Sequence, residues 1–421
     1  MIIYRYFVCV TDGILMLKNK EEKMNRIFKK LMAASLSAAV IVSAFAGCTQ
    51  NGGDTATTTT TGSGTATSGV IKIGGIGPLT GGAAVYGQAV KNAAELAVDE
   101  INAAGGINGM TIEFKYEDDV HDAEKSVNAY NSLKDWGMQI LMGTVTSKPC
   151  QAVVEETHKD SMFQLTPSGS AVESIKYDNA FRVCFSDPNQ GIASAQYIGT
   201  NKIATKVAVI YNSSDVYSSG IYEKFAAEAA NQSFEIVAAE AFTDDSKTDF
   251  NVQLTKAKDS GAELVFLPIY YQEAALILQQ ASKMGYAPKF FGCDGLDGIL
   301  TVENFDTALA EGVMLLTPFA ADATDDKTKA FVASYKAKFG EVPNQFAADA
   351  YDAMYIIKAA AEKAGVKADM SISDICAAMK TAMTQITVDG LTGTGMTWSA
   401  DGEPTKAPKA VVITDGVYKA A

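Results

Sequence analysis

The chain has 421 residues, of which 48% are hydrophobic and 20% are charged, an ordinary composition for folded globular domains. Its formal net charge of −14 at pH 7 would repel a phosphate backbone, so we expect no nucleic-acid partner. Only two histidines and six scattered cysteines without a CxxC pair are present, so we expect no metal site and no cofactor.

The first fifty residues predict export. Arg26, Lys29 and Lys30 precede an uncharged run at 31–46, after which come Gly47 and Cys48. A positive segment, a short apolar run and small residues at its end are typical of a signal peptide. The run is shorter than the roughly 20 apolar residues of a spanning helix. We interpret residues 1–47 as a signal peptide, with Met24 as an alternative start of the chain.

The segment Phe45-Ala46-Gly47-Cys48 resembles a bacterial lipobox, which implies that Cys48 becomes the lipidated first residue of the mature chain. The alternative is an ordinary signal peptide cleaved near Ala46. Residues 49–68 are almost entirely Thr, Gly, Ser, Ala and Asn, with too little apolar surface to offset the entropy of ordering. We therefore predict a flexible tether over 48–69, which favours the lipid anchor.

From Val70 onward, apolar runs typical of strands alternate with segments of helical period. The first series predicts strands at 70–76, 111–116, 139–142, 163–165 and 181–185, and helices at 86–104, 123–136 and 148–158. The second series predicts strands at 206–211, 234–239, 263–268 and 289–292, and helices at 221–231, 250–259 and 273–284. Two further helices, at 327–339 and 345–364, and a final strand at 410–414 follow.

Repeated β-α units predict parallel sheets with helices on both faces. Two such series indicate an α/β protein with two doubly wound, Rossmann-like lobes, which also suits the length of the chain. Ligands of such sheets bind beyond the carboxyl ends of the strands. The loops at that edge are rich in hydroxyls, tyrosines and glycines, and they span residues 77–88, 144–149, 166–171, 212–220, 269–272 and 292–298.

Several stretches occur in the order found in one known family. They are IKIGGIGPLTGGAAVYGQAVKNAAELAVDEINAAGGINGMTIEFKYEDD, GTVTSKPCQAVVEE, QLTPSGSA, FRVCFSDPNQG and FFGCDGL. Over about 70–417 the chain resembles the branched-chain amino-acid-binding proteins, the type I periplasmic binding proteins of ABC transporters. The resemblance implies a Venus-flytrap with three crossovers, in which 70–190 plus 318–395 form lobe one and 191–317 plus 396–421 form lobe two.

The ligand that the resemblance implies is an amino acid, branched-chain or similar, held between the lobes and passed to ABC permease subunits. We expect a monomer anchored outside the cytoplasm, at the cell membrane, through Cys48. The carboxylate of the bound amino acid would bind hydroxyls and free N–H groups at a helix N-terminus. Ser147 precedes Pro149 and is predicted as an N-cap, and by resemblance it also meets the carboxylate. Ser168 and Ser170 follow as carboxylate contacts, unless they form only a solvated turn.

The ammonium needs an anion from the other lobe. Asp294 lies where the branched-chain binders carry Glu, and the alternative is an exposed turn aspartate. Tyr270 matches a family tyrosine that contacts the amino group, whereas Tyr271 is expected to pack away from the site. Because Asp is one methylene shorter than Glu, the identity of the solute stays open among leucine-like, small polar and acidic amino acids and short amides.

The remaining expected contacts form the walls of the site, and they are Tyr86, Tyr217, Phe346, Val145 and Thr146. Two departures from the family pattern stand out. The family disulfide would join Val120 and Thr146, so this chain lacks it. Lys148 places a cation near the cleft rim, where an acidic ligand side chain would find a partner.

The sequence also bears on two other classes of function, an enzyme and a ligand sensor. The segment 75–80 is a broken GxGxxG with a proline, and GxxxxGK[ST], HExxH and GxSxG do not occur, so we expect no enzyme. A ligand sensor that docks on a signalling receptor would have the same lobes and the same site, and it remains the alternative to a transport protein.

Overall fold

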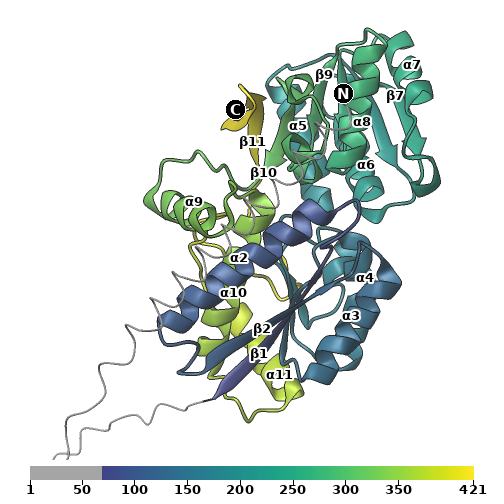
Figure 1. Cartoon of the computed structure of the whole chain (residues 1–421). Coiled ribbons are helices and arrows are strands. Elements are labelled where there is room, and N and C mark those ends of the chain that lie inside the picture. Colours follow the sequence, from purple (N-terminus) through teal and green to yellow (C-terminus); the bar gives the residue numbers. More distant parts are fainter. Residues whose placement is uncertain (1–68) are drawn as a thin grey trace, which may run out of the picture. The chain divides into compact units, whose positions relative to one another are not determined.

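The structure is a computed structural model that describes residues 69–421; the expected signal peptide, Cys48 and the tether up to residue 68 lie outside them. The described chain forms two α/β lobes, each built around its own sheet (Figure 1). The predicted architecture, an α/β protein with two doubly wound lobes, is therefore confirmed.

Lobe one is built on a parallel five-stranded sheet with the strand order β2-β1-β3-β4-β5. Helix α2 packs against α10 on one face of this sheet, and α3 packs against α4 on the other (Figure 1). Its strands are β1 (Val70–Gly77), β2 (Thr111–Asp118), β3 (Ile140–Gly143), β4 (Gln164–Thr166) and β5 (Ala180–Arg182). Its helices are α2 (Ala84–Ala103), α3 (Ala123–Trp136), α4 (Ser147–Lys159), α9 (Asp326–Phe339), α10 (Gln345–Ala364) and α11 (Ile372–Met383).

Lobe two has a seven-stranded sheet with the order β12-β11-β10-β9-β8-β6-β7, in which only the pairings that involve β11 are antiparallel. Its strands are β6 (Lys206–Asn212), β7 (Glu235–Phe242), β8 (Leu264–Leu267), β9 (Lys289–Gly292), β10 (Met314–Thr317), β11 (Lys409–Thr414) and β12 (Val417–Ala420). Its helices are α5 (Asp187–Thr200), α6 (Val216–Ala229), α7 (Asn251–Asp259) and α8 (Tyr271–Lys283), with short 3-10 turns at η2 (Asp244–Ser246), η3 (Asp294–Leu296) and η4 (Ile299–Thr301).

Four elements were absent from the sequence-based prediction: α5, β10, α11 and β12. Helix α5 contains Gly191 and Gly199, which lower helix propensity. A Cβ at Gly191 would lie 2.4 Å from the carbonyl oxygen of Ile221 in α6. The glycine that weakens the local helix signal is therefore the residue that permits the close packing of α5 on α6.

Another close approach positions the ligand edge of lobe one. A Cβ at Gly87 would lie 2.0 Å from the carbonyl oxygen of Pro78, in the loop that follows β1. The first turn of α2 can lie against this loop only because residue 87 has no side chain. This packing brings the neighbouring Tyr86, which is fully buried, to the carboxyl edge of the sheet.

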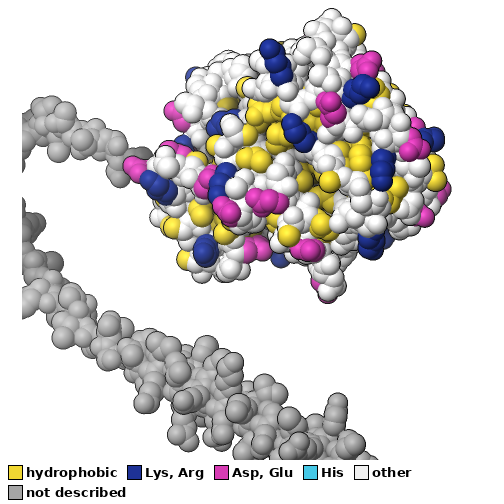
Figure 2. Space-filling view, turned by 90° about the horizontal axis from the view of Figure 1, so that it is seen from above, with side chains coloured by type: hydrophobic (Ala, Val, Ile, Leu, Met, Phe, Trp, Pro, Cys, Tyr) yellow, Lys and Arg dark blue, Asp and Glu magenta, His cyan; other side chains and the backbone are white. Residues whose placement is uncertain are grey.

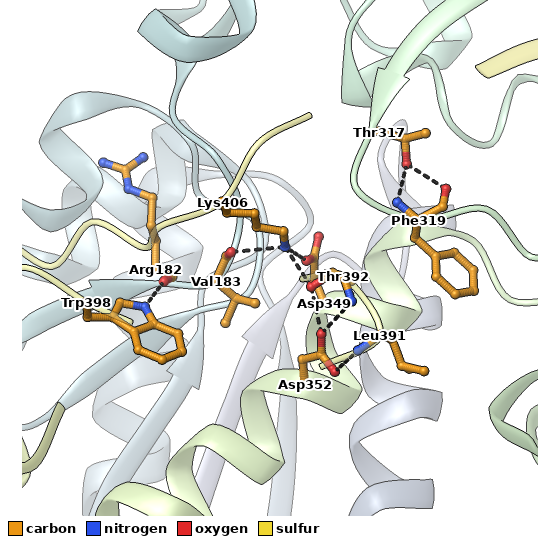
Figure 3. Close-up of polar contacts among 10 residues, drawn as sticks. All are labelled: Arg182, Val183, Thr317, Phe319, Asp349, Asp352, Leu391, Thr392, Trp398 and Lys406. Carbon is orange, nitrogen blue, oxygen red and sulfur yellow. Dashed lines mark hydrogen bonds and ion pairs between the residues drawn. The ribbon is translucent and has the colours of Figure 1, made fainter. Parts of the chain in front are cut away.

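The chain passes between the lobes three times, after Arg182, after Thr317 and before Lys409. Figure 3 shows the polar contacts at these crossovers. Residues 396–408 bond to lobe one: Trp398 Nε1 donates to Arg182 O, and Lys406 Nζ donates to Val183 O. Lys406 also forms a buried ion pair with Asp349 of α10, 2.6 Å long, so this crossover is fixed to lobe one.

Charges of both signs are mixed on one face of the described chain. The face drawn in Figure 2 carries basic and acidic side chains near one another, with hydrophobic side chains between them. Within residues 69–421 no helix is both long and apolar enough to span a bilayer. The four cysteines in this range, Cys150, Cys184, Cys293 and Cys376, are buried and unbridged.

Candidate functional site

A closed cleft lies between the lobes at the carboxyl ends of their parallel strands. All ten residues expected from the sequence line it together with Gly295, which was not expected. In this closed conformation the side chains leave about 10 Å³ between them, so a ligand would enter only after the lobes part. The ten are Tyr86, Val145, Thr146, Ser147, Ser168, Ser170, Tyr217, Tyr270, Asp294 and Phe346.

The lobe-one wall is built by the start of α4 and the loop after β4. Ser147 is the first helical residue rather than the N-cap, which is Thr146, so the N-cap prediction for Ser147 was wrong. Its Oγ accepts instead from the N–H groups of Ser170 and Ala171, each at 3.2 Å. Because the first N–H groups of a helix have no intrahelical partner, this corner collects donors suited to a carboxylate.

The loop after β4 is fixed by hydrogen bonds to other residues of lobe one. Ser168 Oγ donates to Val145 O at 2.6 Å, which ties the two lobe-one loops together. Arg182, with no exposed side-chain surface, donates from Nη1 to the carbonyl oxygens of Gly169 and Ser170. These bonds fix the loop through its backbone carbonyl oxygens.

His121 is a site residue that sequence reasoning missed. Its Nδ1 lies 2.8 Å from Thr146 Oγ1, and its ring packs edge-on against Tyr270 at 5.4 Å. Burial lowers the pKa of His121 to about 4, so the ring is neutral at physiological pH. A hydrogen bond therefore joins the two segments that the family disulfide would join, and nothing local in the sequence distinguished this histidine.

The lobe-two wall centres on Asp294, at the start of η3 after β9. Tyr217 donates its hydroxyl to Asp294 Oδ1 at 2.7 Å and accepts from the N–H of Gly295 at 2.9 Å. Asp294 is only 5% exposed, so the alternative of an exposed turn aspartate is excluded. Burial raises the pKa of Asp294 to about 7, and the Tyr217 hydrogen bond opposes this shift. A carboxylate without a cationic partner at this depth is suited to bind one.

Aromatic rings close the cleft between these two walls. Tyr217 and Tyr270 stack with ring centroids 4.8 Å apart, and Tyr86 lies 4.2 Å from Phe346 and 5.0 Å from Tyr271. The Tyr86 hydroxyl belongs to lobe one, yet it donates to Gly295 O and accepts from the N–H of Tyr271, both in lobe two. Tyr86 therefore stabilises the closed conformation through hydrogen bonds between the lobes.

Two further acids lie behind the lobe-two wall. Asp187 and Asp215 are buried at the starts of α5 and α6, and burial raises the pKa of both, that of Asp215 to about 6. Neither oxygen of Asp187 has a hydrogen-bond partner, nor has the Tyr270 hydroxyl. The Asp-Pro pair in FSDPNQG was a usable signal for a helix start here, because proline is favoured in a first turn.

Lys148 follows Ser147 in the first turn of α4 and is not among the residues that line the cleft. It bridges to Asp244 of lobe two at 3.3 Å, and both side chains are largely exposed. The cation therefore already has a partner from the opposite lobe, which weakens the case for its contact with an acidic ligand. Within residues 69–421 no group of three or more His, Cys, Asp or Glu side chains is arranged to hold a metal ion.

Comparison with known proteins gives one consistent result. Residues 70–416 match the family described as periplasmic binding protein. The chain is 30% identical over 297 residues to a leucine-, isoleucine-, valine-, threonine- and alanine-binding protein of Pseudomonas aeruginosa, covering 70% of this chain and 79% of that one. It is 32% identical over 299 residues to Leu/Ile/Val-binding protein homolog 3 of Brucella melitensis, with the same coverage.

A solved structure is similar over most of the described chain. It is the branched-chain amino acid transporter substrate binding protein LivJ of Streptococcus pneumoniae in complex with isoleucine. The TM-score is 0.76 at 30% identity, and the match covers 83% of this chain and 98% of that one.

Proposed function

Since the chain belongs to the periplasmic binding protein family, as a solute-binding protein of the branched-chain amino-acid transporter type, we propose that its solute is a free α-amino acid with an apolar side chain. Its relatives are binding proteins and not enzymes. The observation that carries the proposal is the division of the cleft into two chemically opposite ends, one in each lobe.

The lobe-one end accepts the carboxylate. The first turn of α4 and the Ser147 hydroxyl provide donors, and Ser147 Oγ is held in place by the N–H groups of Ser170 and Ala171. The lobe-two end accepts the ammonium at Asp294, whose Oδ1 is oriented by Tyr217. A zwitterion bridges these ends, whereas an amine or a carboxylic acid alone satisfies only one of them.

The side chain of the ligand lies among Val145, Phe346 and the tyrosine rings. These surfaces favour an aliphatic body, and hydrophobic burial contributes roughly 0.8 kcal/mol for each CH₂ group. Such a pocket discriminates weakly between neighbouring aliphatic side chains, about 10- to 200-fold per methylene at most. We therefore propose leucine, isoleucine and valine as a group, together with smaller relatives of lower affinity.

Binding and closure are one equilibrium. A ligand that touches both lobes favours the closed form by the difference between its affinities for the closed and open states. We propose that the closed form delivers the amino acid to the permease of an ABC importer, and that lipidated Cys48 tethers the protein outside the cell membrane. Metabolic labelling with a radioactive fatty acid, compared between the wild-type chain and Cys48→Ala, tests the anchor.

The solute itself is tested by calorimetry with three matched compounds: leucine, its deaminated analogue 4-methylpentanoate, and its decarboxylated analogue 3-methylbutylamine. We expect heat and a raised Tm with leucine alone at micromolar concentration. Binding of 4-methylpentanoate as tight as that of leucine would contradict the zwitterion assignment, and so would equally tight binding of 3-methylbutylamine that is lost in Asp294→Asn. A response to an amide or an acidic amino acid, and not to leucine, would contradict the apolar side chain.

A further inference from the structure

A second and much larger cavity lies apart from the cleft, beside the first turns of α2. It is a groove of about 690 Å³, within the usual range of roughly 300–1,000 Å³ for small-molecule sites. We call it the hinge groove. Lobe one contributes α2, α9 and the loop before α10, and lobe two contributes η4, β10, β11 and β12. Its walls include Val85, Ala89, Leu300, Leu315, Phe319, Val332, Tyr335, Pro343, Val411 and Tyr418.

These walls are mainly apolar, and some of that surface faces water. Val342 and Val417 at the rim are 58% and 50% exposed, which is unusual for β-branched side chains. Large exposed apolar surfaces on otherwise charged proteins are typical of binding sites. The hinge groove can therefore bury the apolar part of a ligand.

The charges of the hinge groove have one sign. Asp297, Asp322 and Glu341 line it, and its lining contains no lysine, arginine or histidine. Asp297 is 5% exposed; its Oδ2 accepts from the N–H of Gln345 at 2.8 Å, whereas its Oδ1 has no hydrogen-bond partner. Burial raises the pKa of Asp297 to about 6, so most of its population is ionised at pH 7.4. A buried anion without a cation favours a cationic ligand.

We propose that the hinge groove is a second ligand site, for a hydrophobic cation whose ammonium or amidinium group binds Asp297 and whose apolar body lies along α2 and β11. An anionic ligand would meet three carboxylates and no compensating cation. A neutral ligand would gain the apolar contacts and leave the Asp297 carboxylate unpaired.

The hinge groove is physically connected to the amino-acid cleft. Asp294 and Asp297 belong to one short loop, the first facing the cleft and the second lining the groove. Gln345 bonds to both, because its N–H donates to Asp297 Oδ2 and its Nε2 donates to Asp294 O at 2.7 Å. Both lobes also line the groove, so an occupant alters the opening equilibrium and hence the affinity of the cleft. By linkage, the amino acid then alters the affinity of the cation by the same factor.

Protonated 2-phenylethylamine is a suitable probe, and 3-phenylpropionate is its anionic control. Calorimetric titration of the purified full-length chain should show saturable binding of the amine and none of the acid at the same concentration. Asp297→Asn should weaken amine binding at least about tenfold, since the substitution removes the negative charge and keeps an oxygen that accepts from the Gln345 N–H. Ala321→Trp, which places a ring in the hinge groove, should abolish amine binding.

Asp294→Asn separates this site from the cleft, because an amine bound at the cleft would be lost in that variant. We expect amine binding to persist in Asp294→Asn and amino-acid binding to persist in Asp297→Asn. Loss of the amine in Asp294→Asn but not in Asp297→Asn would overturn the proposal. Equal binding of amine and acid, or no amine binding at millimolar concentration, would overturn it as well.

Discussion

Removing the charge of Asp294 is the sharpest test of how the cleft recognises its solute. Asn at this position keeps the size of the side chain and an oxygen that accepts from the Tyr217 hydroxyl, but it offers the ligand ammonium no negative charge. Truncating one partner of a buried, hydrogen-bonded charge pair costs about 2–5 kcal/mol of binding free energy. At 1.4 kcal/mol per tenfold change, the Kd for leucine should rise between roughly 30-fold and several thousand-fold.

The pH dependence gives a second, independent readout. Burial raises the pKa of Asp294 to about 7 in the ligand-free protein, so below pH 7 the proton must leave before the ammonium can bind. The wild-type Kd should therefore be nearly constant above pH 7 and should rise as the pH falls below 7, by up to about tenfold per pH unit. Asp294→Asn should lose this dependence.

Stability should change in the opposite direction to affinity. An aspartate whose folded pKa is raised binds its proton more tightly when folded, so between about pH 4 and 7 it lowers stability as the pH rises. Asp294→Asn removes that cost and should raise the Tm of the ligand-free protein at pH 8, with little difference near pH 4. Calorimetric titration and differential scanning calorimetry measure the two effects. A Kd within twofold of wild type at pH 8 would refute the ammonium assignment.

Three other changes have expected outcomes. Ser147→Ala removes the hydroxyl that we propose donates to the ligand carboxylate, so leucine should bind about tenfold more weakly in calorimetry. An unchanged Kd would contradict the carboxylate assignment. Lys406→Met leaves Asp349 buried without its cation, so the free energy of unfolding measured by urea denaturation should fall by about 3 kcal/mol. The double variant Lys406→Met/Asp349→Leu should recover most of this loss. A loss below about 1 kcal/mol in the single variant would argue against the coupling of the two residues. Lys148→Ala breaks an exposed ion pair with Asp244, so leucine affinity should change less than about fivefold, and not at all in 1 M salt; a larger loss for glutamate than for leucine would instead show a direct ligand contact.

The sequence predicts those elements whose signal is local. The helix at Ala123–Trp136 was predicted to the residue, because its apolar period runs from the Asp122 N-cap to the Gly137 C-cap. Helix α5 was missed because its packing on α6 selects glycine against helix propensity. Edge strand β12 has only four residues, too few for a periodic signal, and its pairing with β11 is visible only in the folded sheet.

The cleft residues follow a similar division. The family resemblance named ten residues that the structure brings together, since family motifs carry information about distant contacts. It did not supply His121, which acts by supporting Thr146 and Tyr270, nor the depth at which Asp187 and Asp215 lie. Ser147 is the first helical residue and not the N-cap because α4 begins one residue earlier than predicted, and the exact first residue of a helix is hard to predict from sequence.

Two of the three crossovers enter lobe two as neighbouring strands. Thr317 at the end of β10 lies opposite Lys409 at the start of β11, in an antiparallel pair. Two crossover strands that are hydrogen-bonded to each other share one rotation axis, whereas two unpaired strands could each rotate independently. The lobes should therefore open by a hinge rotation about one dominant axis, with little twist of one lobe relative to the other. A lobe that can swing in only one way returns to the same closed register, which keeps Asp294 opposite Ser147 after each release of the solute.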